Sequence, residues 1–597
     1  MAYQEKYTDP KQRVGANFVP GQGTYIKLWA PKAQQVSIAW EGGDEAPLAA
    51  EEDGYFTGHF PQSQPGSRYR FILDGKTRLA DPASRFQPLD TDGSSEVVAD
   101  DFAWHDATWQ SVPFNTWVIY ELHAGTYSPS HDFDGIIADL PRLKDLGITT
   151  IELMPVSQFS GARNWGYDGV FPHAVQHSYG GPQKLKALVD ACHAQGLAII
   201  LDVVYNHLGP EGNVLFQCAP YATEKYNVPW GEALNFDGEE NHHVRHYFLQ
   251  SAWQWLVEYH FDGLRLDAVQ MIFDNTPIPF MQELYQLKCE AEKIRGCPLV
   301  LIGESDMNDA RILMPPEQNG FGLEAHWADD FHHAIHATLT GEQDGYYADY
   351  GGVEQLARIY ERGVAFEGEY SPFRKRPHGR SYAGIDKKKL VVETQNHDQT
   401  GNRLKGERLI GLVGFEKAKL GAAAVLLSPF TPFLFMGEEL ANEQPFLYFI
   451  SHHDQELIAK SRESRAEEWK SFGWKEEPPD PGDEQTFLQS VLQDKNPAAG
   501  SKAAAMRDYY KALIALSKEV RTFGKPEVQL IAEAQQIILR YVDKIQVVLA
   551  FGEQETQLPE VEGECILHSG VYDEGERKEL AKITSMPPFS AGVWRKP

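Results

Sequence analysis

The sequence predicts an α/β protein built on a (β/α)8 TIM barrel, with an N-terminal β-sandwich domain and a C-terminal β domain. Two observations carry this prediction. In the middle of the chain, eight apolar strand-like runs alternate with helical segments, and eight parallel strands close a barrel of this kind. Both ends of the chain instead show short strand-like runs separated by turn residues. A length of 597 residues also exceeds one compact core, so several domains are expected.

The first domain is predicted over residues 1–104. Its strand-like runs are TYIKLWAP, QVSIAW, YFTGHF and SRYRFILDG, and Asp74-Gly75 is a pair typical of hairpin turns. We expect these runs to form a small β-sandwich. The following segment, HDATWQSVPFN (105–115), is predicted to link it to the barrel.

The barrel is predicted over residues 105–518 and the C-terminal β domain over 519–597. The eight barrel runs are WVIYEL, TTIEL, AIILDVV, GLRLD, LVLIGE, FGLEAHW, KLVVETQ and PFLFMGEE. Helical segments such as FDGIIADLPRLKDLG and PQKLKALVDACHAQG lie between them, the second ending at Gly196. Strand alternation resumes after the barrel in VQLIAEA, QIILRYV and KIQVVLAF.

Composition excludes several kinds of partner. The 85 acidic against 55 basic residues give a formal charge of −30, which repels nucleic-acid phosphates and anionic membrane surfaces. The five cysteines form no CxxC pair, so neither a disulfide framework nor a thiolate zinc site is expected. The sequence shows no signal peptide and no run long enough to span a membrane, so a cytoplasmic protein is expected.

Carboxylates stand where several predicted strands end. Asp267 ends GLRLD, Glu304 ends LVLIGE, Asp398 follows KLVVETQ, and Asp202 begins the segment DVVYNH, which ends at His207. Sites in such barrels are built at the carboxyl-terminal ends of the strands. Acidic groups that converge there in different protonation states are what cleavage of a glycosidic bond requires.

Local sequence assigns these carboxylates different roles. Strand alternation places Arg265 on the same face as Asp267, so the cation keeps Asp267 ionised and suited to be a nucleophile. Burial and neighbouring acids favour the protonated form of Glu304, as a general acid needs. Asp398, beside His397, is predicted to bind sugar hydroxyls and stabilise positive charge in the transition state. The scheme predicts retention of configuration and carboxyls about 5 Å apart.

The segments DVVYNH, GLRLDAV, IGES and QNHD resemble the four ordered signature segments of the α-amylase superfamily. The resemblance implies that Asp267 is the nucleophile, Glu304 the acid/base and Asp398 the third acidic group. It also implies sugar or acid contacts for the remaining site residues, which are Arg265, His207, His397, Tyr167 in NWGYDG, and Asp202, the last as a support of the site.

Other segments narrow the resemblance to one subgroup. VIYELHAGTYS, NWGYDGV, DDFHHAIHATLTGE, NHDQTGNRLKGER, MGEE and FGWKEEPPDP are similar to the subgroup that releases trehalose from maltooligosyl trehalose. Hydrolysis of the α-1,4 bond next to the terminal trehalose is therefore expected, with a maltooligosyl trehalose or a related α-1,4-glucan as the partner. A glucan branching enzyme, a debranching or α-amylase-type hydrolase, and a noncatalytic glucan-binding protein are the alternatives.

Some of these residues also have purely structural explanations. Asp202 and His207 can brace the barrel mouth, and Tyr167 can be a packed aromatic. The histidine clusters HHVRH (242–246) and FHHAIH (331–336) lack the glutamate of a zinc protease motif. Asn206 matches a position that holds calcium in many superfamily members, but its partner ligands cannot be traced. No metal and no cofactor are therefore predicted.

Overall fold

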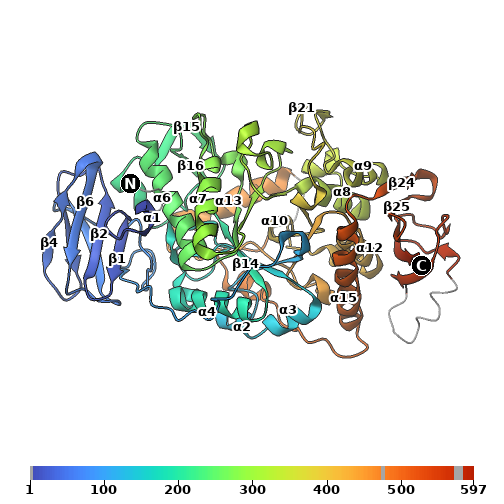
Figure 1. Ribbon diagram of the computed structural model, residues 1–597, viewed down its shortest axis with the longest axis horizontal. Helices are drawn as coiled ribbons and strands as arrows, with labels where there is room; N and C mark the ends of the chain where they lie inside the picture. Colours follow the sequence, from blue (N-terminus) through green and yellow to red (C-terminus); the bar gives the residue numbers. More distant parts are fainter. Residues whose placement is uncertain (1–4, 472–477, 571–582, 597) are drawn as a thin grey trace.

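The computed structural model describes residues 5–471, 478–570 and 583–596. Its long axis runs from antiparallel sheets at the N-terminal end, through a central barrel, to a C-terminal sheet at the opposite end (Figure 1). The segment 472–477, which begins the quoted motif FGWKEEPPDP, lies outside the described residues.

Two antiparallel sheets form the N-terminal part, as the turn-separated runs predict. One has the order β1-β2-β6-β5, and the other contains β4-β3-β7-β8 with β9 beside β7. Asp74 and Gly75 form the β7–β8 turn with φ of 52° and 67°, the left-handed backbone that a tight hairpin needs. The strands are β1 (Gly15–Val19), β2 (Gly23–Trp29), β3 (Val36–Trp40), β4 (Glu45–Pro47), β5 (Ala49–Ala50), β6 (Tyr55–Phe60), β7 (Arg68–Leu73), β8 (Thr77–Leu79) and β9 (Ser95–Glu96).

Eight parallel strands close a barrel, each on one of the eight predicted runs. Their order around the barrel is the order in the chain, and β10 pairs with β23 to close it. The strands are β10 (Ile119–Leu122), β11 (Thr150–Leu153), β14 (Ala198–Val203), β17 (Gly263–Leu266), β18 (Val300–Glu304), β19 (Ala325–Trp327), β22 (Leu390–Val392) and β23 (Thr431–Phe435).

Helices cover the outside of the barrel. The predicted helix PQKLKALVDACHAQG is α4 (Gly181–Ala194), with Gly196 at φ 67° just beyond its end. FDGIIADLPRLKDLG forms two helices, α2 (Phe133–Ile137) and α3 (Leu140–Leu146), because Pro141 lacks an amide hydrogen and fits only the first turn of a new helix. Longer covering helices are α6 (Asn241–Trp253), α7 (Phe280–Arg295), α8 (Asp329–Thr340), α9 (Val353–Arg362), α12 (Phe415–Leu426) and α15 (Lys502–Val520).

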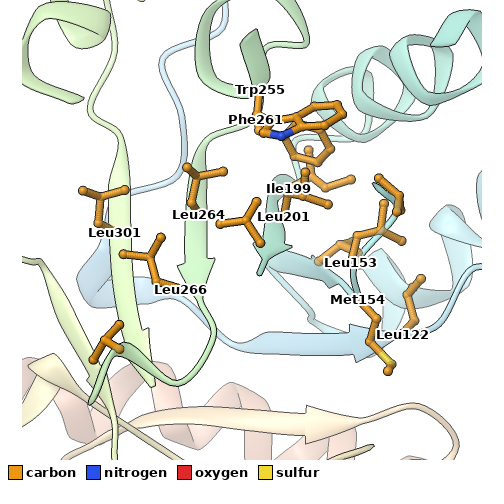
Figure 2. Close-up of a cluster of buried hydrophobic side chains, with 14 of the residues drawn as sticks. Leu122, Leu153, Met154, Ile199, Leu201, Trp255, Phe261, Leu264, Leu266 and Leu301 are labelled. Carbon is orange, nitrogen blue, oxygen red and sulfur yellow. The ribbon is translucent and has the colours of Figure 1, made fainter. Parts of the chain in front are cut away.

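The alternation of side chains along the strands separates two cores. One set of strand residues packs outward against the helices, and Figure 2 shows part of it, with Leu122, Leu153, Leu201 and Leu264 drawn from neighbouring strands. The alternate set, which includes Ile119, Ile200, Ile302, Val391 and Phe433, forms a separate cluster inside the barrel. Because side chains alternate with period two, the next inward position on each strand lies at its carboxyl-terminal end.

The C-terminal part is an antiparallel sheet of order β24-β25-β26-β30-β28, with a smaller β27–β29 pair. Its strands β24 (Glu527–Ile531), β25 (Gln536–Tyr541) and β26 (Ile545–Ala550) are the three predicted runs, and β28 (Glu564–His568) and β30 (Ser590–Arg595) complete it. Among the described residues, no helix combines the length and the hydrophobicity needed to cross a membrane.

Candidate active site

Polar side chains replace apolar ones at the last inward position of the barrel strands. On β10, Ile119 is followed two residues later by Glu121; on β14, Ile200 by Asp202; on β18, Ile302 by Glu304. The full set is Glu121, Glu152, Asp202, Arg265, Glu304, Trp327 and Glu393, and each except Glu304 is at most 3% exposed. Charged groups at this depth are costly unless they are paired or neutral, so their arrangement matters.

Arg265 joins the acidic side chains of three neighbouring strands. Its Nη1 donates to both oxygens of Asp202, each at 2.9 Å, and to Asp267 Oδ1 at 2.8 Å. Its Nη2 lies 3.6 Å from Glu304 Oε2. The guanidinium also lies over the ring of Trp327, 4.7 Å from the centroid. One buried cation therefore hydrogen-bonds Asp202 and Asp267 and lies beside Glu304 at the mouth of the barrel.

Glu304 is the acid whose surroundings favour a proton. Burial raises the pKa of Glu304 well above its usual value, and the charges of Asp267 and Asp329 raise it further. Arg265 and the Ala268 amide act in the opposite direction, the amide donating to Glu304 Oε2 at 2.6 Å. Ala268 adopts left-handed backbone angles, φ 40° and ψ 57°, which are uncommon for alanine. This turn directs its amide hydrogen at the carboxyl group.

Tyr167 and His397 are stacked beside the Arg265 group. Their ring centroids are 5.1 Å apart with an interplanar angle of 21°. The Tyr167 hydroxyl donates to Asp202 Oδ2 at 2.6 Å, so both oxygens of this buried carboxylate are bound by protein groups. Burial raises the pKa of Asp202 to about 6, although Arg265 opposes the shift.

Glu121 holds His397 through both of its oxygens. The His397 backbone amide donates to Oε2 at 3.0 Å, and Nδ1 forms a short hydrogen bond with Oε1. Burial alone would lower the pKa of His397, but the Glu121 charge outweighs it and the pKa is raised. The imidazole is thereby fixed in orientation, and its Nε2 makes no hydrogen bond within the part of the chain that the structure describes.

Asn206 connects His207 to the acidic group. Its amide donates to the Asp267 backbone carbonyl at 2.8 Å and to Asp267 Oδ2 at 2.7 Å. Its Oδ1 pairs closely with His207 Nδ1, and the His207 ring stacks on Trp230 with centroids 5.2 Å apart. Asn206 stands at a position that holds calcium in many superfamily members, but here its side chain hydrogen-bonds Asp267 and His207.

Asp398 lies outside this contact group, on the wall of a cavity of about 220 Å³. Its side chain is exposed, and its Oδ1 accepts a hydrogen bond from Asn402 at 2.7 Å. Across the described residues, no hydrogen bond or ion pair joins it to Asp267 or Glu304. It is nevertheless close to Asp329, whose pKa burial raises to about 8 with the help of Asp306 and Asp398.

The rest of the cavity combines charged and aromatic side chains. Its walls include Asp306, Glu342, Asp344, Tyr346, Tyr347, Phe373, Arg374 and Arg403. Hydrogen-bonding groups interleaved with aromatic faces suit a sugar ring, which presents hydroxyls at its edge and C–H groups on its faces. The cavity is therefore a candidate binding place for a sugar unit beside the acids.

Three glutamates of this set, Glu121, Glu152 and Glu393, were not anticipated from the sequence. Glu121 and Glu152 sit in VIYEL and TTIEL, where a single acid interrupts a run that is otherwise apolar, and the two residues are register partners on β10 and β11. A single acid within an apolar strand was the signal in the sequence that these two residues belong to the site. Trp327 supports Arg265, but nothing local in FGLEAHW distinguishes this role from packing.

Comparisons with known proteins agree with this geometry. Residues 84–230 match the family model of the α-amylase catalytic domain. A malto-oligosyltrehalose trehalohydrolase from Saccharolobus solfataricus is 43% identical over 83% of this chain and 85% of its own. One from Arthrobacter ramosus is 42% identical over 83% and 87%. A crystal structure of a putative α-amylase from Salmonella typhimurium, 34% identical, superposes with a TM-score of 0.89 over 98% of this chain and 99% of its own.

Sequence, fold and the acidic layer at the barrel mouth thus agree, and the chain belongs to the malto-oligosyltrehalose trehalohydrolase family of α-amylase-type glycoside hydrolases.

Proposed function

We propose that this protein hydrolyses the α-1,4-glucosidic bond next to the terminal trehalose of a maltooligosyl trehalose and releases free trehalose. The observation that carries the proposal is the sharing of Arg265 by Asp267 and Glu304. Asp267 accepts hydrogen bonds from Asn206 and Arg265, whereas burial raises the pKa of Glu304 well above its usual value and favours its neutral form. A nucleophile and an acid of this kind are what a retaining glycosidase needs.

The reaction proceeds in two displacements. Asp267 attacks the anomeric carbon while Glu304 gives its proton to the departing glycosidic oxygen, so trehalose leaves and a glycosyl-enzyme ester forms. Glu304, now ionised, takes a proton from water as that water attacks the anomeric carbon. The ester bond to Asp267 breaks, the oligosaccharide is released with its configuration retained, and both carboxyls return to their starting states.

The remaining site residues position the sugar and the acids. Tyr167 and His397 form one aromatic wall, and Asp398 contributes a carboxylate that binds hydroxyls and offsets positive charge at the transition state. Asp202 and His207 keep Arg265 and Asp267 in place. The cavity beside Asp398 receives a sugar unit next to the cleaved bond. A cytoplasmic location is part of the same proposal.

Product analysis with maltotriosyl trehalose tests this function. We expect maltotriose and trehalose in equal amounts, with one new reducing end for each trehalose. A glucan branching enzyme would transfer chains without new reducing ends, and an α-amylase or debranching enzyme would give maltose or linear chains without trehalose. Either of these product sets would contradict the proposal.

A further inference from the structure

A second cluster of titratable groups lies where the N-terminal sheets meet the barrel. Glu240, His242 and His243 surround the start of α6, and each offers one atom, all within 4.8 Å of one another. We propose that these three side chains bind one divalent transition-metal ion, with zinc as the best match. Two imidazoles and a carboxylate are a common zinc ligand set, in which water completes the tetrahedron.

The orientation of His243 fits a metal ligand. Its Nδ1 hydrogen-bonds the Tyr55 hydroxyl at 3.0 Å, and its Nε2 lies 3.3 Å from Glu240 Oε2. Histidines that bind metals usually engage their other ring nitrogen in this way, which fixes the tautomer and the ring direction. The ring is buried against Trp29, with centroids 4.7 Å apart, so it has little freedom to turn away.

The backbone before α6 brings the other two ligands to His243. Glu240 has left-handed angles, φ 59° and ψ 13°, and its carbonyl accepts the His243 amide at 3.1 Å. This tight turn places its carboxylate beside the imidazole of His243. The His242 ring lies 3.8 Å from the His243 ring. A non-glycine residue in this conformation is uncommon, and such backbone strain is often found at ligand sites.

The proposed site lies at a junction of two parts of the fold. His243 packs on Trp29 of β2 and Tyr55 of β6, whereas His242 and His243 both belong to a barrel helix. An ion that binds only the folded chain stabilises it by mass action, so it would hold the ligand turn in the conformation that packs against these strands. No metal was expected from the sequence because HHVRH lacks the glutamate of a helical zinc protease motif. The proposed ligands instead come from the turn Glu240–His243.

Metal titration of the purified full-length chain, after chelator treatment, tests the site. We expect one equivalent of Zn²⁺ by equilibrium dialysis, and with Co²⁺ the visible absorption of a four-coordinate ion. His242→Ala and Glu240→Gln should weaken Zn²⁺ binding by more than about tenfold, and Tyr55→Phe, which acts through His243, by about tenfold. These variants change two exposed ligands and one hydroxyl, so folding can be checked separately by thermal denaturation.

Two matched variants control for surface binding. Glu239→Gln changes the neighbouring exposed acid, and His59→Ala removes an exposed histidine of β6; both should bind Zn²⁺ like the original chain. If the original chain takes up no Zn²⁺, the cluster is only an ion pair between His243 and Glu240 and the proposal is wrong. Equal binding by His242→Ala and His59→Ala would also overturn it.

Discussion

Glu121 offers a direct test of how the barrel interior supports the catalytic groups. Its two oxygens accept hydrogen bonds from His397 Nδ1 and from the His397 amide, and its side chain is fully buried. Glu121→Gln keeps the shape but turns one acceptor into a donor, so one hydrogen bond to a charged group is lost. Such a bond contributes about 1.5–3 kcal/mol. If the transition state loses the whole of this stabilisation, kcat/KM falls about 10- to 150-fold.

Glu152→Gln is the matched control. Glu152 is also a buried inward glutamate and is the register partner of Glu121, but neither of its oxygens has a hydrogen-bond partner within the described chain. Burial, with the charges of Glu121 and Asp202, raises its pKa well above the usual value, so glutamine resembles its neutral form. Initial rates on maltotriosyl trehalose should change less than about threefold. Equal losses in both variants, or an undiminished rate in Glu121→Gln, would refute the positioning role.

Three further predictions concern the acids and the aromatic wall. Glu304→Gln cannot donate a proton and should lower kcat by about 100-fold or more while KM changes little, as steady-state kinetics will show; an unchanged kcat would remove Glu304 from the mechanism. Glu304 must be protonated to act and its pKa is raised, so kcat/KM should fall as pH rises through the pKa of Glu304. On the acidic side, kcat/KM should fall below about pH 6, because Asp202 then takes up a proton. A pH profile that is flat on both sides would contradict both assignments. Tyr167→Phe removes the hydroxyl that donates to Asp202. A hydrogen bond to a charged group contributes about 1.5–3 kcal/mol, so kcat/KM should fall about 10-fold or more while the products stay the same. Retained activity would mean that Tyr167 is only a packed aromatic.

Local patterns were sufficient to predict the barrel strands and the contact between Arg265 and Asp267. The strands are apolar runs with polar ends, and period-two alternation places Arg265 and Asp267 on one face, as their 2.8 Å hydrogen bond shows. The break at Pro141 was missed because the apolar pattern continues across it, although proline itself was a signal. The protonation expected for Glu304 agrees in direction with its buried surroundings.

Contacts between distant parts of the chain could not be predicted. Glu121 and His397 are 276 positions apart. Closure of the barrel pairs β10 with β23, which in turn pairs with β22, and so brings the segment after β22 within reach of Glu121. Glu342 and Arg374, which line the cavity beside Asp398, likewise belong to segments between α8 and β22. A single sequence does not show that these segments lie close to Asp398. Local periodicity determines which side a residue faces, but its partner across the barrel depends on the complete fold.

The central claim is that Asp267 forms a covalent bond to the sugar while Glu304 acts as acid and base. A maltooligosyl fluoride carrying fluorine at C5 of the reacting unit should trap this ester, because the substitution slows its hydrolysis. Peptide mass spectrometry after trapping should then find the added glycosyl mass on the peptide that contains Asp267. Labelling of Asp398 instead, or hydrolysis with inverted configuration and no labelled peptide, would contradict the account.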